Sequence, residues 1–272
     1  MRRRTMSGLL VLALATSLAG GAGAAERADL GRHFRGNAGT FVLLDAQTGR
    51  TLRHDAERAR RRFVPASTFK VPNSLIALDT GVAAGPDFAI TRDDALAPPA
   101  PWWPPAWSER TQTMRTALSG SVVWYYQELA RRIGPARIQA YLDRFDYGNR
   151  DLSGGIDRFW LTGGLRISAE EQVAFLRRLY FGELGVSERT TRIVKQLLVL
   201  EDTGAYRLSG KTGWAGFGEP STPQVGWLVG WVERGTDVHL FALNLDVRSE
   251  QDAAARLAIT KAILRDAGVI DR

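Results

Sequence analysis

Apolar runs of strand length cluster near both ends of the chain. Residues 40–45 and 51–54 are separated by the polar stretch Gln47-Thr48-Gly49-Arg50, which predicts a β-hairpin. Toward the C-terminus, a turn over residues 233–237 joins the last two of three further predicted strands: residues 206–210, 224–232 and 238–247. A helix from about Glu250 to Ala267 is expected to end the chain.

The middle of the chain has the helical period instead. Apolar side chains at positions 122, 123, 126, 129, 130 and 133 share one helix face, and Gly134 follows. Ser168 and Glu171 have the spacing of a capping box. The predicted helices cover residues 67–80, 122–133, about 138–145, about 168–181 and 187 to about 200. We therefore expect an α/β fold of the α+β type, in which N- and C-terminal elements form one antiparallel sheet around an inserted all-helical lobe. The cleft between the lobes is the expected place of a site.

The N-terminal segment has the pattern of a secretory signal peptide. Arg2-Arg3-Arg4 precedes the apolar run Leu9–Leu18, and Ala22-Gly23-Ala24 provides a small-residue cleavage site. The alternative is a membrane anchor, but the run is shorter than the ~20 residues that a span requires. Residues 1–24 are predicted to be the leader of a periplasmic protein without a membrane span, and residues 25–272 its single catalytic domain. The sheet lobe should cover about 25–65 and 204–272, and the helical lobe about 66–203.

Composition removes several classes of function. The 272 residues include no cysteine, which excludes disulfide scaffolds, zinc ribbons, iron–sulfur clusters and thiol nucleophiles. The net charge of +7 is spread along the chain, apart from the three arginines of the leader, so nucleic-acid binding is not expected. His33, His54 and His239 show no ligand spacing, and no metal site is expected.

Lysine is scarce, which makes each lysine informative. Of 36 basic residues only four are Lys, at positions 70, 195, 211 and 261. A lysine can lose its proton and act as a base, whereas an arginine cannot. In Ser67-Thr68-Phe69-Lys70 the two polar groups lie one helical turn apart, so a neutral Lys70 amine could activate the Ser67 hydroxyl. The helix N-terminus would offer N–H groups to an oxyanion. The competing interpretation of Ser67 is a simple helix cap.

The second lysine motif is Lys211-Thr212-Gly213, at the end of a predicted strand. It would present a cation, a hydroxyl and an uncluttered backbone to a carboxylate-bearing substrate, although a plain turn is the alternative. Taken in this order, S-x-x-K and K-T-G are the signature of penicillin-recognising serine acyltransferases.

Further motifs make the resemblance more specific. The chain resembles the class D serine β-lactamases over nearly all of its predicted mature length. The matching motifs are Ser67-Thr68-Phe69-Lys70, Ser121-Val122-Val123, Tyr147-Gly148-Asn149, Trp160-Leu161 and Lys211-Thr212-Gly213. The resemblance implies the β-lactamase/penicillin-binding transpeptidase-like fold, hydrolysis of β-lactam antibiotics, and antibiotic resistance.

The resemblance also implies roles for the motif residues. Ser67 would be acylated, and Lys70, carbamylated by dissolved CO2 to N6-carboxylysine, would be the general base. Trp160 would donate its indole N–H to the carbamate, although it could equally be a core aromatic. Ser121 would relay a proton to the lactam nitrogen, and Val123 would pack over the Lys70 pocket. No other cofactor is implied.

Substrate binding is implied at the K-T-G strand. The N–H groups of Ser67 and Trp214 would form the oxyanion hole. Lys211, Thr212 and Arg256, beside Gly213, would hold the substrate carboxylate. Arg248 is the alternative to Arg256. Tyr147 and Asn149 are expected to shape the loop that leads to Trp160.

Three other functions remain in competition: a penicillin-binding sensor domain, a D,D-peptidase, and a non-catalytic basic binding protein. The proline-rich loop Pro98–Pro105, with Trp102 and Trp103, is either a rigid surface loop or a wall of the substrate cleft. The partner is expected to be a small-molecule β-lactam. The sequence leaves open which β-lactams are used and whether the protein is a monomer or a homodimer.

Overall fold

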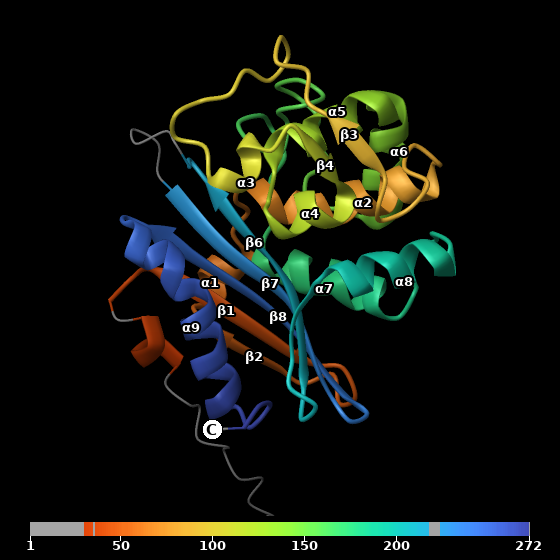
Figure 1. Cartoon of the computed structure of the whole chain (residues 1–272). Helices are drawn as coiled ribbons and strands as arrows, with labels where there is room; N and C mark the ends of the chain where they lie inside the picture. The colour runs from red at the N-terminus through yellow and green to blue at the C-terminus, as the bar shows by residue number, and fades with distance from the viewer. Residues whose placement is uncertain (1–29, 35, 218–223, 272) are drawn as a thin grey trace, which may run out of the picture.

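A six-stranded sheet and a helical lobe form the two parts of the molecule (Figure 1). The computed structural model describes residues 30–34, 36–217 and 224–271. The strands of these residues are β1 (Gly39–Asp45), β2 (Thr51–His54), β3 (Ala89–Thr91), β4 (Thr111–Thr113), β5 (Val199–Asp202), β6 (Arg207–Ala215), β7 (Gln224–Arg234) and β8 (Asp237–Val247). The α-helices are α1 (Ala56–Arg60), α2 (Lys70–Asp79), α3 (Pro105–Ser108), α4 (Met114–Ser119), α5 (Val123–Ile133), α6 (Pro135–Phe145), α7 (Ala169–Tyr180), α8 (Glu188–Leu197) and α9 (Glu250–Asp266). Two 3-10 helices are η1 (Leu30–Phe34) and η2 (Ala66–Phe69).

Both ends of the described chain contribute to one sheet. The strand order is β2-β1-β8-β7-β6-β5, and every neighbouring pair is antiparallel. N-terminal β1 pairs with C-terminal β8, with Phe41 opposite Leu243. The predicted β1–β2 hairpin and the predicted fold class are confirmed.

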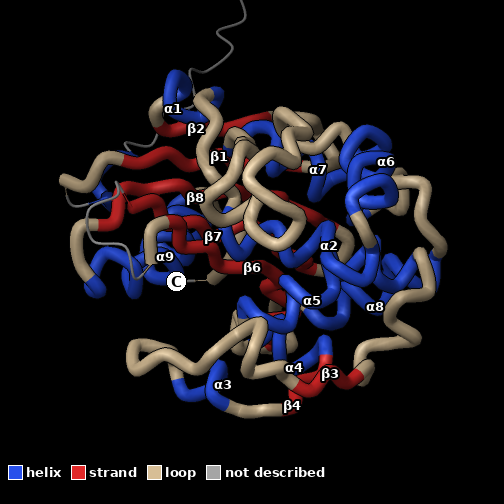
Figure 2. The backbone as a smooth tube through the Cα atoms, turned by 90° about the horizontal axis from the view of Figure 1, so that it is seen from above, coloured by secondary structure: helices blue, strands red, loops and turns tan. Residues whose placement is uncertain are grey.

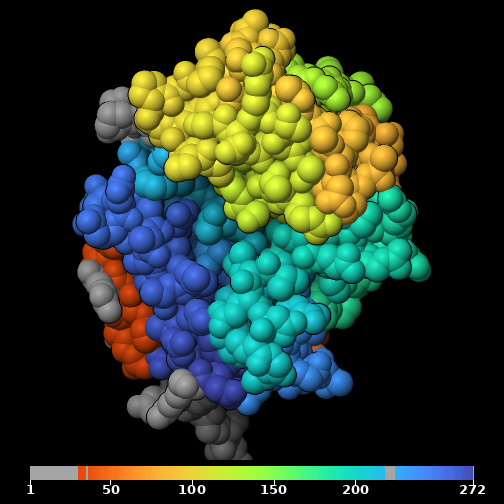
Figure 3. All heavy atoms as spheres, viewed as in Figure 1, coloured from red at the N-terminus to blue at the C-terminus, as the bar shows by residue number. Residues whose placement is uncertain are grey.

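Each face of the sheet is covered, because each carries apolar side chains. On one face, α9 and η1 pack over a core that includes Phe41, Leu228 and Ile263. On the other face lie α7 and the helical lobe (Figure 1), and their core includes Leu75, Val229 and Leu240. From above (Figure 2), α2 and α5 lie side by side over this second core. The surface is hollowed where the two lobes meet (Figure 3).

The long helices follow their sequence signals. Ser168 caps α7 with the predicted capping box, since its side chain accepts from the Glu171 N–H and Glu171 accepts from the Ser168 N–H. The Ser67 motif begins one turn earlier than α2, in the 3-10 helix η2. The elements that the pattern missed are short: η1, α1, α3, α4, β5 and the β3–β4 ribbon.

Two boundaries differ from the prediction. The helix expected to reach Leu200 ends at Leu197, and Val199–Asp202 forms the edge strand β5 against β6. The strand expected over 206–210 continues to Ala215, because β7 supplies pairing partners along its whole length. The K-T-G motif therefore lies inside a strand rather than at a strand end.

The predicted leader, residues 1–24, lies outside the described residues. Among the residues that the structure describes, no helix is both long and apolar enough to cross a membrane.

Candidate active site

Ser67 and Lys70 meet where η2 joins α2. Lys70, the first residue of α2, places its Nζ 2.8 Å from the Ser67 Oγ and donates to it. The Lys70 side chain is fully buried, with the Tyr126 ring 5.5 Å away. Burial, assisted by the positive charge of Lys211, holds the pKa of Lys70 well below its usual range. The amine is therefore suited to take a proton from Ser67.

The turn that carries Ser67 is strained, and several hydrogen bonds hold it. Ala66, directly before it, has a left-handed backbone with φ of 49°. The Ala66 N–H donates to the Trp160 carbonyl over 3.0 Å. The Thr68 hydroxyl donates to the Pro65 carbonyl and accepts from Gln172. These bonds hold the Ser67 turn in place against the cost of the strained backbone.

Trp160 is both a core aromatic and an unpaired donor. Its ring is fully buried and stacks on Phe69, with the ring centroids 5.3 Å apart. Its Nε1 has no hydrogen-bond partner among the described residues. Buried N–H groups are almost always paired, so this indole is available to an acceptor that the polypeptide does not supply.

Ser121 connects the two lobes. It lies between α4 and α5, in a left-handed backbone conformation with φ of 54°. Its Oγ accepts a hydrogen bond from Lys211 Nζ on β6, over 3.0 Å. The neighbouring Val123 is the first residue of α5 and packs against the core that contains Phe69.

Lys211 is a buried cation beside another cation. Its Nζ also contacts the carbonyl and the hydroxyl of Thr212, at 3.0 and 3.3 Å. Burial, together with the charge of Arg256, lowers the pKa of Lys211 to about 7. Protonated and neutral Lys211 are therefore both populated near neutral pH.

Arg256 reaches the K-T-G strand from α9. It donates to the Gly213 carbonyl, and its guanidinium lies 5.8 Å from the Trp214 ring. Burial lowers the pKa of Arg256 to about 10. The alternative residue, Arg248, is exposed, and its N–H donates to Asp252. The geometry thus favours Arg256 as the basic partner of Lys211.

The three basic side chains of the site, Lys70, Lys211 and Arg256, share one property. Within the described chain, no carboxylate lies within 4.0 Å of the side-chain nitrogens of Lys70, Lys211 or Arg256. Arg58, by contrast, is paired with Asp246. A cleft with unpaired cations favours an anionic ligand.

Gly213 allows the two halves of the site to touch. A Cβ there would lie 3.0 Å from the Pro65 carbonyl oxygen and 3.1 Å from the Thr68 methyl carbon. A Cβ at these distances would be tighter than an ordinary contact, so glycine favours the close approach of β6 to the Ser67 turn. Trp214 follows, and its indole N–H donates to Gln224.

The Tyr147-Gly148-Asn149 motif holds the loop after Trp160. Asn149 donates to the Gly164 carbonyl and accepts from the Arg166 N–H, each over 2.8 Å. A Cβ at Gly148 would lie 2.0 Å from the Arg166 carbonyl oxygen. The Tyr147 ring packs edge-on against Phe69. The motif is thus structural, but these contacts hold the loop that follows Trp160 rather than the loop that leads to it.

An aromatic cluster lies between the proline-rich loop and the end of β6. Trp102 and Trp107 lie 5.8 and 6.1 Å from Phe217, centroid to centroid, and Phe217 lies 4.8 Å from Trp214. The loop is thus joined to the segment that follows K-T-G, which favours the cleft-wall interpretation. The sequence did not single out Trp107 or Phe217, because the contact joins segments about 110 residues apart.

The histidines lie elsewhere and in separate places. His33 pairs with Asp266, and His54 stacks on Phe34. The part of the chain that the structure describes contains no group of three or more His, Cys, Asp or Glu residues arranged to hold a metal.

Fold and site together define a penicillin-recognising serine acyltransferase. Residues 39–266 match the family model of the penicillin binding protein transpeptidase domain. The chain is 44% identical to β-lactamase OXA-48 of Klebsiella pneumoniae over 232 residues, which cover 85% of this chain and 84% of the relative. It is 38% identical to β-lactamase OXA-10 of Pseudomonas aeruginosa over 269 residues, 98% of this chain and 99% of the relative.

Solved structures of class D β-lactamases are also similar to this chain. The class D β-lactamase YbXI from Nostoc superposes with a TM-score of 0.83 at 39% identity, covering 89% of this chain and 99% of the other. FUS-1 (OXA-85), a class D β-lactamase from Fusobacterium nucleatum subsp. polymorphum, gives 0.82 at 33% identity, covering 89% and 98%. The chain belongs to the class D serine β-lactamases.

Proposed function

We propose that this enzyme opens the ring of penicillin-type antibiotics through an acyl-enzyme at Ser67, with Lys70 as general base, and so confers resistance to them. The observation that carries the proposal is the buried Lys70 amine, 2.8 Å from the Ser67 Oγ and without a carboxylate partner within the described chain. A lysine in this setting can hold the neutral form that a base requires.

Acylation follows from the arrangement. Ser67 Oγ attacks the lactam carbonyl carbon while its proton passes to Lys70. The resulting oxyanion accepts from the N–H groups of Ser67 and Trp214. The C–N bond then breaks, and the lactam nitrogen receives a proton through Ser121, whose Oγ is already hydrogen-bonded to Lys211.

Deacylation uses the same base. Lys70 takes a proton from a water molecule, the water oxygen attacks the ester carbonyl, and the proton returns to the Ser67 oxygen as it leaves. Carbamylation would give Lys70 a carboxylate that can accept this proton, since the neutral amine adds CO2 and releases one proton. The residues fit this modification, because the Trp160 indole N–H is buried and unpaired and its ring stacks on Phe69, the residue before Lys70. No metal is required, and CO2 is the only small-molecule requirement.

The substrate carboxylate would bind at β6. Lys211, the Thr212 hydroxyl and Arg256 converge there, and Gly213 leaves the backbone free of a side chain. Val123 at the start of α5 is proposed to cover the Lys70 pocket. An anion between Lys211 and Arg256 would relieve the repulsion of the two cations.

The test is turnover of nitrocefin by the wild type and by the Ser67→Ala and Lys70→Ala variants, with Lys261→Ala as the matched lysine control. We expect steady turnover in the wild type and the control, and loss in the two variants. With a penicillin as substrate, intact-mass spectra should show a penicilloyl adduct that decays in the wild type. A wild-type adduct that persists without product release would instead identify a sensor domain or a D,D-peptidase.

The chemistry of Lys70 has its own test. Activity should fall at low pH and recover on addition of bicarbonate, because protonation of the amine drives off CO2. Activity that does not respond to bicarbonate would contradict carbamylation without contradicting the acyl-enzyme.

We also propose that residues 1–24 direct export to the periplasm. Cell fractionation and N-terminal sequencing should find the mature chain in the periplasm, beginning near Ala25. Recovery of the intact N-terminus in the cytoplasm would contradict this proposal.

A further inference from the structure

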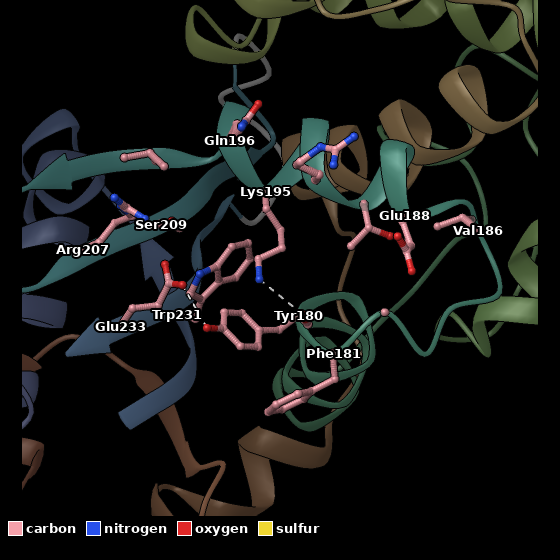
Figure 4. A pocket seen from close by; sticks show the side chains of 14 residues that line it. Tyr180, Phe181, Val186, Glu188, Lys195, Gln196, Arg207, Ser209, Trp231 and Glu233 are labelled. Carbon is pink, nitrogen blue, oxygen red and sulfur yellow. Dashed lines mark hydrogen bonds between the residues drawn. The ribbon is translucent and has the colours of Figure 1, made fainter. Parts of the chain in front are cut away.

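A cavity lies between the end of α7, α8 and the β5–β7 part of the sheet (Figure 4). Its volume is about 450 Å³, and its walls come from the end of α7, from α8, and from β5, β6 and β7. On β6 it includes Ser209, which precedes Lys211 by two residues and shares its side of the strand. The residues that line it include none of the proposed catalytic or carboxylate-binding residues. The size is that of a site for a small organic molecule.

The walls of the cavity combine aromatic and aliphatic side chains with charged ones, which are Glu188, Arg192, Lys195, Arg207 and Glu233. The rings of Tyr180 and Trp231 lie edge to face with centroids 5.7 Å apart. Val186 and Val199 add aliphatic surface. Surfaces of this kind favour a flat apolar group.

The floor of the cavity holds two buried polar groups without partners. Ser209 and Trp231 are opposite each other in the β6–β7 register, and both are almost completely buried. Ser209 Oγ and Trp231 Nε1 have no hydrogen-bond partner among the described residues. An unmet buried donor costs about 1–3 kcal/mol, so both groups favour a ligand that can accept hydrogen bonds.

A lysine amine lies in the same cavity. Lys195 Nζ is 3.6 Å from the centre of the Tyr180 ring and 3.3 Å from the Tyr180 carbonyl oxygen (Figure 4). Within the described chain, no carboxylate lies within 4.0 Å of it. The nearby Glu233 carboxylate instead accepts from the Tyr180 hydroxyl, over 2.9 Å. Lys261, by contrast, is paired with Glu201.

These donors and walls together define a ligand class. We propose that this cavity is a second binding site, separate from the catalytic cleft, for a small aromatic carboxylate. The carboxylate accepts from Lys195 Nζ, the Trp231 indole and the Ser209 hydroxyl, and the aromatic ring packs against Tyr180. The competing explanation is ordered water that satisfies the same donors, and it is an outcome of the test.

The experiment is a titration of the full chain with benzoate, followed by the indole N–H signals in ¹H–¹⁵N spectra. The Trp231 signal is assigned as the one absent from a Trp231→Phe variant. We expect it to shift and saturate, with a Kd of about 1 mM. Lys195→Met should weaken binding at least tenfold and Ser209→Ala by severalfold. The matched control, Lys261→Met, should leave the Kd unchanged.

Three further arms separate the alternatives. Arg256→Ala disables the proposed carboxylate site in the cleft and should leave the Trp231 shift intact, so this result does not depend on the proposed catalytic function. Acetate and benzyl alcohol, which lack the ring and the charge respectively, should bind much more weakly than benzoate. Nitrocefin turnover by Lys195→Met at the wild-type rate would show that the variant is folded.

Two results would overturn the proposal. An unmoved Trp231 signal at saturating benzoate would mean that the cavity holds only water. Equal binding of benzoate to the wild type and Lys195→Met, or equal binding of benzyl alcohol, would mean that the charge is not recognised.

Discussion

The two lobes each contribute one buried lysine to the cleft, and the surroundings of the two lysines differ. Lys70 lies at the first residue of α2, near the Tyr126 ring, and its Nζ contacts the Ser67 hydroxyl. Lys211 lies within β6, with two hydroxyl groups and a carbonyl around its Nζ and Arg256 beyond. The pKa of Lys70 is therefore lowered well below its usual range, whereas the pKa of Lys211 is lowered to about 7. One type of side chain is thus suited to be a neutral base in one place and a cation that an anion can stabilise in the other.

The largest expected difference is in turnover. Lys70→Met should lower kcat by about 10³–10⁴-fold, because the variant has no general base. Lys211→Met should act mainly on KM, with a loss in kcat/KM of about 10–100-fold, because a carboxylate contact is lost. Steady-state kinetics with nitrocefin distinguish the two. Equal losses of kcat in both variants would contradict the different roles proposed for the two lysines.

Trp160→Phe should give the next largest effect. The phenyl ring keeps the stacking on Phe69, but the unpaired indole N–H is lost. We expect kcat to fall about 10–100-fold, by analogy with the loss of groups that orient a catalytic ligand, and excess bicarbonate should restore part of it. If the variant needs no more bicarbonate than the wild type, the indole does not hold a carbamate.

A smaller effect is expected on stability, which Lys70→Met should increase although it abolishes activity. The folded chain disfavours protonated Lys70, so its pKa is lower in the folded than in the unfolded state. The wild type should therefore gain stability as the pH rises toward the unfolded value of 10.5. Lys70→Met should raise the free energy of unfolding by about 1 kcal/mol near pH 7 and flatten this slope. Urea unfolding across pH provides the measurement, and an unchanged slope would refute the assignment.

The smallest effect is a shift in a pH profile. Free Lys211 should lose its charge above pH of about 7, so that kcat/KM falls on the alkaline side. Arg256→Ala removes the neighbouring positive charge, which should raise the pKa of Lys211 and move this alkaline limb upward, even though the maximum of kcat/KM is lower. If the alkaline limb of the kcat/KM profile does not move in Arg256→Ala, a group other than Lys211 titrates there.

Local chemistry was predictable from the sequence. The i, i+3 spacing of Ser67 and Lys70 survives because both residues lie in consecutive helical turns, although the first turn is 3-10. The Ser168 capping box depends only on residues within one turn. In both cases a few neighbouring residues determine the contact.

Long-range contacts were less predictable. Val199 and Leu200 continue the apolar pattern of α8, and they form a strand because β6 offers a partner edge. Arg256 meets Gly213 only because α9 packs across the sheet. The resemblance to a family indicated Arg256, but spacing alone could not choose between it and Arg248. The contact of Trp102 with Phe217 likewise depends on the assembly of both lobes.

The pairing of β1 with β8 has a consequence for how the chain folds. Gly39 and Leu245 are neighbours in the sheet although about 200 residues separate them along the chain. Closing so long a loop is slow, because its entropic cost precedes any gain from the contact. During synthesis, the helices between the two strands can form before β8 is available to pair with the apolar strand β1. We expect a populated intermediate with formed helices and an incomplete sheet, in which β1 is the segment most exposed to aggregation.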